Sequence, residues 1–173
     1  SDPQACALTD ADGDVDSASQ KTIEFAAKSC VVAPPFGFTD AATINAAATQ
    51  ARLDLDADMF GSDLNAAVTS DKDAATCQSA IVKSVDKLFA TKTKLLLGCV
   101  ADGLDGEPTV MVSAPDLAAC YETLDADADS KAAKSSGKLA GALVDRCDGT
   151  SLADVLPGAC ASSMDVSYCL ETA

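Results

Sequence analysis

The sequence predicts an all-α protein, an antiparallel helical bundle stapled by disulfide bonds. Three observations lead to this fold class: apolar residues recur at helical spacing over much of the 173 residues, alanine dominates several helix faces, and eight cysteines are spread along the whole chain. No two cysteines form a C-x-x-C pair, so they indicate a disulfide framework and not a zinc or iron–sulfur site. Each predicted element follows from a local pattern.

The pattern of residues 1–38 predicts an N-terminal segment that is distinct from the helical bundle core. A short helix is expected over residues 17–30, with two aspartates near its start, where carboxylates interact favourably with the helix dipole. Residues 31–38 contain two consecutive prolines and a glycine, which predict a non-helical connector or arm. Residues 39–173 are expected to form the helical bundle core, and the whole chain a single domain.

A second helix is predicted to begin with Thr39 or Asp40 as its N-cap and to run to Phe60, with Gly61 as its C-terminal stop. Small side chains allow helices to approach closely, so this helix is expected to pack tightly. Its expected buried face is mostly alanine and consists of Ile44, Ala48, Ala51 and Leu55.

The strongest helical pattern covers residues 70–99. Ser70 and Asp73 are expected to form a variant capping box at its start, and Gly98 with the turn-rich residues 102–108 to end it. The predicted buried stripe consists of Ile81, Val82, Val85, Leu88, Phe89 and Leu96.

Two further helices are expected over residues 114–124 and, after the acidic run 125–129, over residues 130–147. Asp129 or Ser130 is the expected N-cap of the last helix. Because the bulky residues of the long helix would face small ones here, the two helices are predicted to lie antiparallel. The expected buried stripe of the last helix consists of Ala133, Ser136, Ala140, Leu143 and Val144.

This arrangement predicts how the cysteines pair. Two of them flank the loop of the helical hairpin, two sit at its far ends, and the other four pair most locally among themselves. The predicted disulfides are Cys77–Cys147, Cys99–Cys120, Cys6–Cys30 and Cys160–Cys169.

Charge and cysteine usage indicate the compartment and exclude some partners. The net charge is −15, and 23 of the 27 acidic residues are aspartate, so nucleic acid would be repelled. A chain that begins at Ser1 and carries a disulfide framework is expected to be exported to the extracellular space, the cell surface or the periplasm; the absence of an N-x-[ST] sequon favours a bacterial source. Apolar stretches such as Leu95 to Leu97 are too short to span a membrane.

Catalytic chemistry has few candidate residues. Without histidine, no Ser-His or Cys-His pair can form, and histidine ligation of haem is excluded. An S-x-x-K pattern occurs at Ser84 to Lys87 and at Ser135 to Lys138, but no S-D-N or K-T-G motif accompanies it. Acid–base catalysis by carboxylates alone, as in glycosidases, remains open. However, the chain has no tryptophan on which a sugar could stack. The chain is therefore predicted not to be an enzyme and to need no cofactor, with Ca²⁺ as a possible exception.

The candidate calcium ligands are carboxylates at alternate positions. Such carboxylates in a loop can converge on one Ca²⁺ ion, although Val15 and Lys21 stand where an EF-hand needs glycine and glutamate. Two further aspartate clusters, at residues 54–58 and 125–129, are interpreted as a solvated helix face and a helix cap. The candidate metal ligands are Asp10, Asp12, Asp14 and Asp16.

Five stretches, at residues 53–61, 77–83, 90–99, 137–147 and 156–160, carry a resemblance to a known group of proteins. They look like uncharacterised Cys-rich exported helical proteins of environmental bacteria, which show a C-x-x-A-I-x-K helix and a later lysine-rich helix that ends in cysteine. The resemblance implies an exported helical protein. It implies no catalytic residues, because the group has no established activity.

Two functions remain open at this point. The first is a structural, non-catalytic secreted protein, a self-associating subunit of an extracellular filament, sheath or surface assembly. The alternative is a monomeric secreted binding or adhesion module that Ca²⁺ stabilises. Alanine-rich faces and the lack of catalytic residues favour the first, whereas the strong negative charge opposes self-association unless salt or Ca²⁺ screens it.

Overall fold

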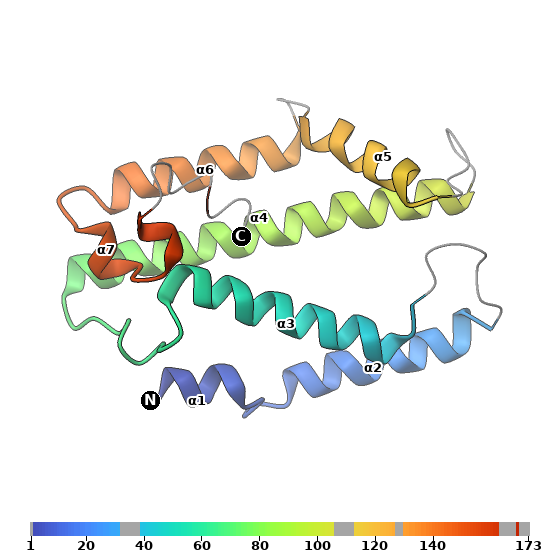
Figure 1. Cartoon of the computed structure of the whole chain (residues 1–173), viewed down its shortest axis with the longest axis horizontal. Helices are drawn as coiled ribbons and strands as arrows, with labels where there is room; N and C mark the ends of the chain where they lie inside the picture. Colours follow the sequence, from blue (N-terminus) through green and yellow to red (C-terminus); the bar gives the residue numbers. More distant parts are fainter. Residues whose placement is uncertain (1, 32–38, 106–112, 127–129, 163–168, 170–173) are drawn as a thin grey trace.

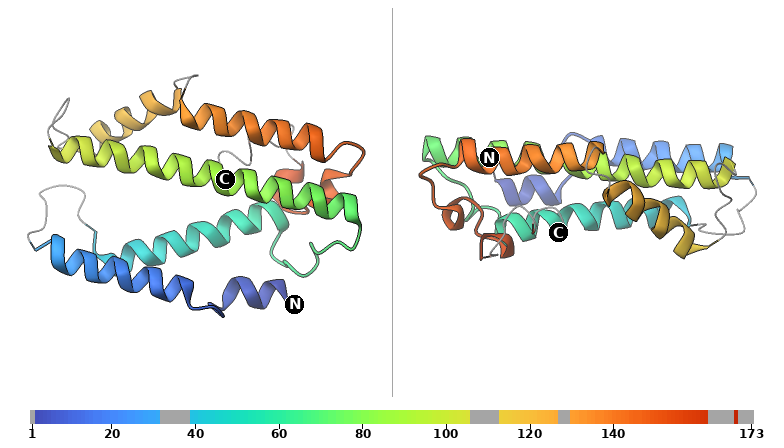
Figure 2. Two further views of the ribbon diagram at one scale, coloured as in Figure 1. Left: turned by 180° about the vertical axis from the view of Figure 1, so that it is seen from behind. Right: turned by 90° about the horizontal axis from the view of Figure 1, so that it is seen from above.

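A computed structural model describes residues 2–31, 39–105, 113–126, 130–162 and 169 (Figure 1). Every regular element within these residues is a helix, and together with three disulfides they confirm the predicted disulfide-stapled all-α bundle. The helices run back and forth along the long axis of the molecule (Figures 1 and 2). In chain order they are α1 (Pro3–Leu8), α2 (Asp14–Ser29), α3 (Ala41–Phe60), α4 (Lys72–Asp105), α5 (Ala114–Ala126), α6 (Lys131–Arg146), α7 (Leu152–Val155) and the 3-10 helix η1 (Ala159–Ser162).

The long helix α4 differs from its predicted form at both ends. Its N-cap side chain is that of Asp71, which accepts a hydrogen bond from the Ala74 backbone N–H at 2.8 Å, so the predicted Ser70 cap is wrong. The helix continues through Gly98 to Asp105, beyond the predicted stop. A glycine inside a helix costs only about 1 kcal/mol, and α5 packs against this last part of α4.

Helices α4 and α6 form the antiparallel hairpin that the sequence predicts. The hydroxyl oxygens of Thr91 and Ser135 lie 3.3 Å apart, near the start of α6. Ser130 caps α6 as predicted, since its side chain accepts from the Ala133 N–H at 3.0 Å. The buried residues of α6, Ala132, Ser135 and Leu139, however, each lie one position before a predicted one. Of the other predicted positions, Leu143 packs against the core as expected, whereas Val144 is 71% exposed.

The one-position error in α6 has a simple cause. Alanine, serine and glycine make up much of this helix and fit a buried or an exposed position equally well, so they do not fix its rotation. Leu139 is the large side chain that the structure buries completely. Phe89 and Leu96 of α4, also predicted to be buried, are 46% and 41% exposed.

Helix α3 begins and ends as predicted. The Asp40 side chain accepts from the Thr43 N–H at 2.9 Å, and Gly61 ends the helix at a φ of 79°, a conformation that favours glycine. Only the C-terminal half of α3 enters the core, where Leu55 and Met59 are buried. The predicted alanine-rich face is therefore mostly exposed, with Ile44 at 49%.

Two N-terminal helices lie along one edge of the molecule (Figure 1). Helix α1 is not predicted from the sequence. Asp2 caps it by accepting from the Ala5 N–H, and Gln4 binds the segment after α3 through the Leu64 N–H at 2.9 Å. Helix α2 begins three residues earlier than predicted, packs mainly against α3, and contains no buried residue.

The C-terminal segment closes the core between α3 and α4. Val155, Leu156 and Cys160 are fully buried and belong to one cluster with the buried side chains of α3, α4 and α6. Gly158 lies against the end of α3, where its N–H donates to the Met59 carbonyl at 3.0 Å. A Cβ atom at this position would lie 2.2 Å from the Asp58 carbonyl oxygen, so only glycine fits.

Several predicted features lie outside the described residues. These are most of the connector (32–38), part of the loop after the long helix (106–112) and most of the third aspartate cluster (127–129).

Candidate functional site

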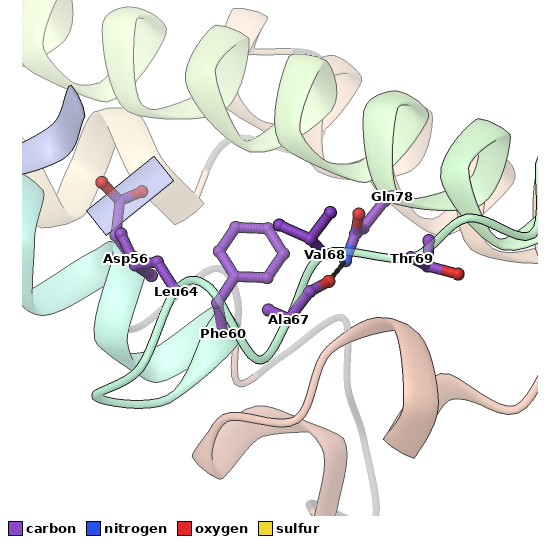
Figure 3. Close-up of a pocket in the computed structure, with 7 residues that line it drawn as sticks. All are labelled: Asp56, Phe60, Leu64, Ala67, Val68, Thr69 and Gln78. Carbon is purple, nitrogen blue, oxygen red and sulfur yellow. Dashed lines mark hydrogen bonds between the residues drawn. The ribbon is translucent and has the colours of Figure 1, made fainter. Parts of the chain in front are cut away.

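A hollow of about 300 Å³ opens between α3, α4 and the segment that joins them (Figure 3). Phe60 at the end of α3 and Val68 of the joining segment give it largely apolar walls. The segment lies there because Gln78 of α4 holds it: the Gln78 side-chain amide donates to the carbonyl oxygens of Ala67 and Val155 at 2.7 and 2.8 Å. The lining residues are Asp56, Phe60, Leu64, Ala67, Val68, Thr69 and Gln78.

The charged side chain of the hollow, Asp56, belongs to an ion-pair network between α3 and α4. Arg52 binds Asp56 through both oxygens, at 3.1 and 3.3 Å, and also binds Asp86 of α4. The Asp56 side chain is only 15% exposed, and burial raises its pKa above the usual value, against the opposing effect of Arg52. Burial lowers the pKa of Arg52, but the hydrogen bond and charge of Asp86 and the charge of Asp56 outweigh it, so the pKa is raised.

This network ties α3 to α4 and leaves the hollow without reactive groups. Both oxygens of Asp56 are engaged by Arg52, and the Thr69 hydroxyl accepts from the Asp71 N–H at 3.1 Å. Apolar walls with engaged polar groups suit an apolar side chain or a small apolar molecule, not bond breaking. Sequence reasoning missed the hollow, because residues 61–71 have no periodic pattern that would place them against α4.

The predicted calcium ligands do not converge. Asp10 accepts hydrogen bonds from the N–H groups of Asp16 at 2.7 Å and Val15 at 3.1 Å, and these bonds lower its pKa. Asp10 therefore caps α2, while Asp12, Asp14 and Asp16 are exposed. Within the residues that the structure describes, no three His, Cys, Asp or Glu side chains are arranged to hold a metal ion. The geometry gives the calcium hypothesis no support.

The two S-x-x-K serines make structural hydrogen bonds. The Ser84 hydroxyl donates to the Ala80 carbonyl of its own helix at 2.9 Å. Ser135 is buried between α4 and α6 beside Thr91. Neither arrangement activates a serine for nucleophilic attack.

Three of the four predicted disulfides are present, and the fourth prediction is wrong. The structure joins Cys77 to Cys147, Cys99 to Cys120 and Cys160 to Cys169.

The unpaired cysteine among the described side chains is Cys30, which is exposed; the side chain of Cys6 lies outside the described part. Cys30 follows α2, which extends away from α1 for 16 residues, about 24 Å. A disulfide needs Cα atoms within about 7 Å, so this arrangement separates the predicted partners.

No described helix combines the length and the low polarity that crossing a membrane requires. The disulfides fit an oxidising compartment. The chain matches no known family model, no curated protein and no solved structure.

Proposed function

We propose that this chain is a non-catalytic structural subunit of an extracellular filament, sheath or surface assembly, which associates with further copies of itself. The observation that carries the proposal is the exposed apolar surface of the α2–α3 hairpin. Phe25 is 68% exposed and Val15 50%, although both lie on a helix with no buried residue of its own. A helix that buries none of its large apolar side chains within the chain is typical of one that packs on another molecule.

The attachment of this hairpin supports the same function. Helix α2 packs mainly on α3, and α3 reaches the core only near Leu55 and Met59. The other half of the hairpin extends along the molecule and keeps Ile44 exposed (Figure 2). An apolar hairpin so displayed is suited to contact a second subunit.

The chemistry of the chain also supports a non-catalytic role. It contains no histidine, and six of its eight cysteines are in disulfides. The serines of the S-x-x-K patterns and the carboxylate of Asp56 are engaged in structural bonds.

Sedimentation velocity over a concentration series tests the proposal. We expect the native chain to form particles larger than a monomer. Phe25→Ser should raise the protein concentration at which half of the chains are associated by roughly tenfold, because an apolar contact is lost. Phe89→Ser removes an equally large, 46% exposed side chain from α4 and serves as the matched control.

Each outcome of this experiment has a defined meaning. A chain that stays monomeric at all concentrations contradicts the proposal. A monomer that loses stability on addition of a chelator favours the calcium-stabilised binding module instead. An assembly that Phe89→Ser weakens as much as Phe25→Ser does would exclude α2 as the contact.

A further inference from the structure

The basic residues of this acidic chain are concentrated on two helices. Residues 72–94 and 131–146, within α4 and α6, hold nine of the 12 basic residues but only three acidic ones. These two stretches carry a net charge of +6, and the remaining residues carry −21. Such a separation of charge creates a positive surface on a protein that is negative elsewhere.

Three of these cations surround a surface hollow of about 470 Å³ on the α4–α6 hairpin. Lys72 and Lys83 come from α4, and Arg146 comes from the end of α6. Alanine residues make up part of the lining, so the cations surround open space instead of bulky side chains. The other lining residues are Ala75, Thr76, Ser79 and Ala80.

The basic surface continues from this hollow along α4. Lys72, Lys83, Lys87 and Lys94 follow one another at intervals of 11, four and seven residues, which places them on one face of the helix, and all four are exposed. In the part of the chain that the structure describes, neither these lysines nor Arg146 form an ion pair; the ion pairs found there are those of Arg52 with Asp56 and Asp86.

We infer that this basic face, centred on Lys72, Lys83 and Arg146, binds the acidic turn between α1 and α2 of a second copy of the chain. The turn is complementary in charge: Asp12, Asp14 and Asp16 are exposed and form no ion pair among the described residues. The bonds from Asp10 to the backbone of α2 fix the shape of the turn. The inference rests on the proposed self-association and adds an electrostatic contact to the apolar one on α2.

The positions of the two surfaces require a second copy. The α1–α2 turn lies along one edge of the molecule and α6 along the opposite edge, with α3 and α4 between them (Figure 1). They therefore cannot meet within one chain. Because the two contacting surfaces differ, each bound copy still offers its own turn and its own basic face, so the contact can repeat along a chain of subunits.

Self-association through this contact also answers the objection that a net charge of −15 makes copies repel. At physiological salt, charges more than about 8 Å apart are largely screened, so the local attraction between the basic face and the turn outweighs the distant repulsion. We therefore expect association to weaken when salt is raised from 0.05 to 0.5 M, because the screening length then becomes short enough to weaken the local attraction as well (it is about 3 Å at 1 M).

Charge reversal at the basic face tests the inference by sedimentation velocity at low salt. We expect the double variant Lys83→Glu and Arg146→Glu to raise the dissociation constant of self-association at least tenfold, since like charges would then oppose each other (about 1.4 kcal/mol per factor of ten). The control variant Lys131→Glu and Lys138→Glu makes the same change in net charge at exposed positions of α6 that do not line the hollow, and we expect it to keep the association.

A charge swap identifies the partner surface. The variant Asp12→Lys and Asp16→Lys should lose self-association, and mixing it with the basic-face variant should restore association between the two. If the native chain assembles and both glutamate variants assemble equally well, the inference is overturned while the proposed function stands. If the mixture fails to associate, the acidic turn is not the partner. A native chain that is monomeric under all conditions overturns both proposals.

Discussion

The α4–α6 hairpin and the α1–α3 layer are both made of helices with many alanines, yet they are held together in different ways. One disulfide joins Cys77 of α4 to Cys147 after α6, another joins Cys99 of α4 to Cys120 of α5, and Ile81, Val85 and Leu139 are buried along the hairpin. The α1–α3 layer is held by helix caps, by the ion pairs of Arg52 and by the buried end of α3, and α2 buries nothing.

This difference matches the two roles that we propose for these regions. A helical pair with a buried stripe, a disulfide between its members and a second disulfide to α5 forms a rigid scaffold, on which exposed charges can be held at fixed positions. A layer with few buried contacts opens locally at lower free energy and keeps apolar surface available for another molecule. We therefore expect perturbations of the hairpin to affect the stability of the whole chain, and perturbations of the layer to act mainly within the layer.

The largest effect should come from removing the disulfide at the open end of the hairpin. Replacing Cys77 and Cys147 with alanine frees a loop of 70 residues, which by the chain-entropy relation costs about 4 kcal/mol of unfolding free energy. Replacing Cys99 and Cys120 frees only 21 residues and should cost about 3 kcal/mol. Urea denaturation monitored by circular dichroism measures both. Equal losses would show that loop length does not set the stability of the hairpin.

The next effect distinguishes the observed rotation of α6 from the predicted one. Leu139→Ala removes a fully buried side chain and should destabilise the chain by about 3 kcal/mol, whereas Val144→Ala removes an exposed one and should change stability by less than about 0.5 kcal/mol. Urea midpoints of the two variants measure the difference. A larger loss of stability for Val144→Ala than for Leu139→Ala would support the buried stripe that the sequence predicts.

These two variants also show where sequence reasoning reaches its limit. The all-α class, the α3 caps Asp40 and Gly61, and three disulfides could be predicted, because capping chemistry and cysteine positions are local or strongly constrained. The rotation of α6 could not, because its small residues do not distinguish a buried face from an exposed one. The exposure of Ile44 could not either, since periodicity indicates an apolar face but not whether another element covers it.

The candidate site was less predictable than the fold. Its hollow depends on Gln78, whose side chain binds carbonyl oxygens 11 and 77 residues away in the sequence, and no local pattern signals such a bond. The aspartates at residues 10–16 did attract attention, but alternating carboxylates serve equally as helix caps and as calcium ligands. The backbone geometry at Asp10 distinguishes the two uses.

The junction between the two regions gives a prediction of intermediate size. Gly158→Ala would place a Cβ atom against the Asp58 carbonyl and should cost about 2 kcal/mol through overpacking, with loss of the contact between α3 and the C-terminal segment. Gly141→Ala in α6 meets no atom within 4 Å, so it should stabilise the chain by about 0.5 kcal/mol through helix propensity. Thermal unfolding compares them. If both variants shifted the unfolding temperature in the same direction, the Asp58 carbonyl would not exclude a side chain at position 158.

The smallest effect concerns acid and should be confined to the α1–α3 layer. The bonds that Asp40 accepts from the N–H and hydroxyl of Thr43 lower its pKa below 3.8, so the folded state favours the ionised carboxylate. The resulting stabilisation is present above about pH 4 and is lost as the pH falls through the lowered pKa. We expect the Thr43 amide to exchange with solvent faster below pH 4, relative to the intrinsic rate, while amides in the middle of α4 do not change.

Two variants make this acid response specific to Asp40. Asp40→Asn retains a capping side chain that does not titrate, so the protection of Thr43 should become independent of pH; Asp40→Ala should lose that protection at every pH. Asp56, at the other end of α3, has a raised pKa, so its ionised form is disfavoured by folding and acid does not weaken that end through this residue. If acid loosened α4 as readily as the start of α3, the layer would not be the more weakly held part of the molecule, and the contrast between the two regions would fail.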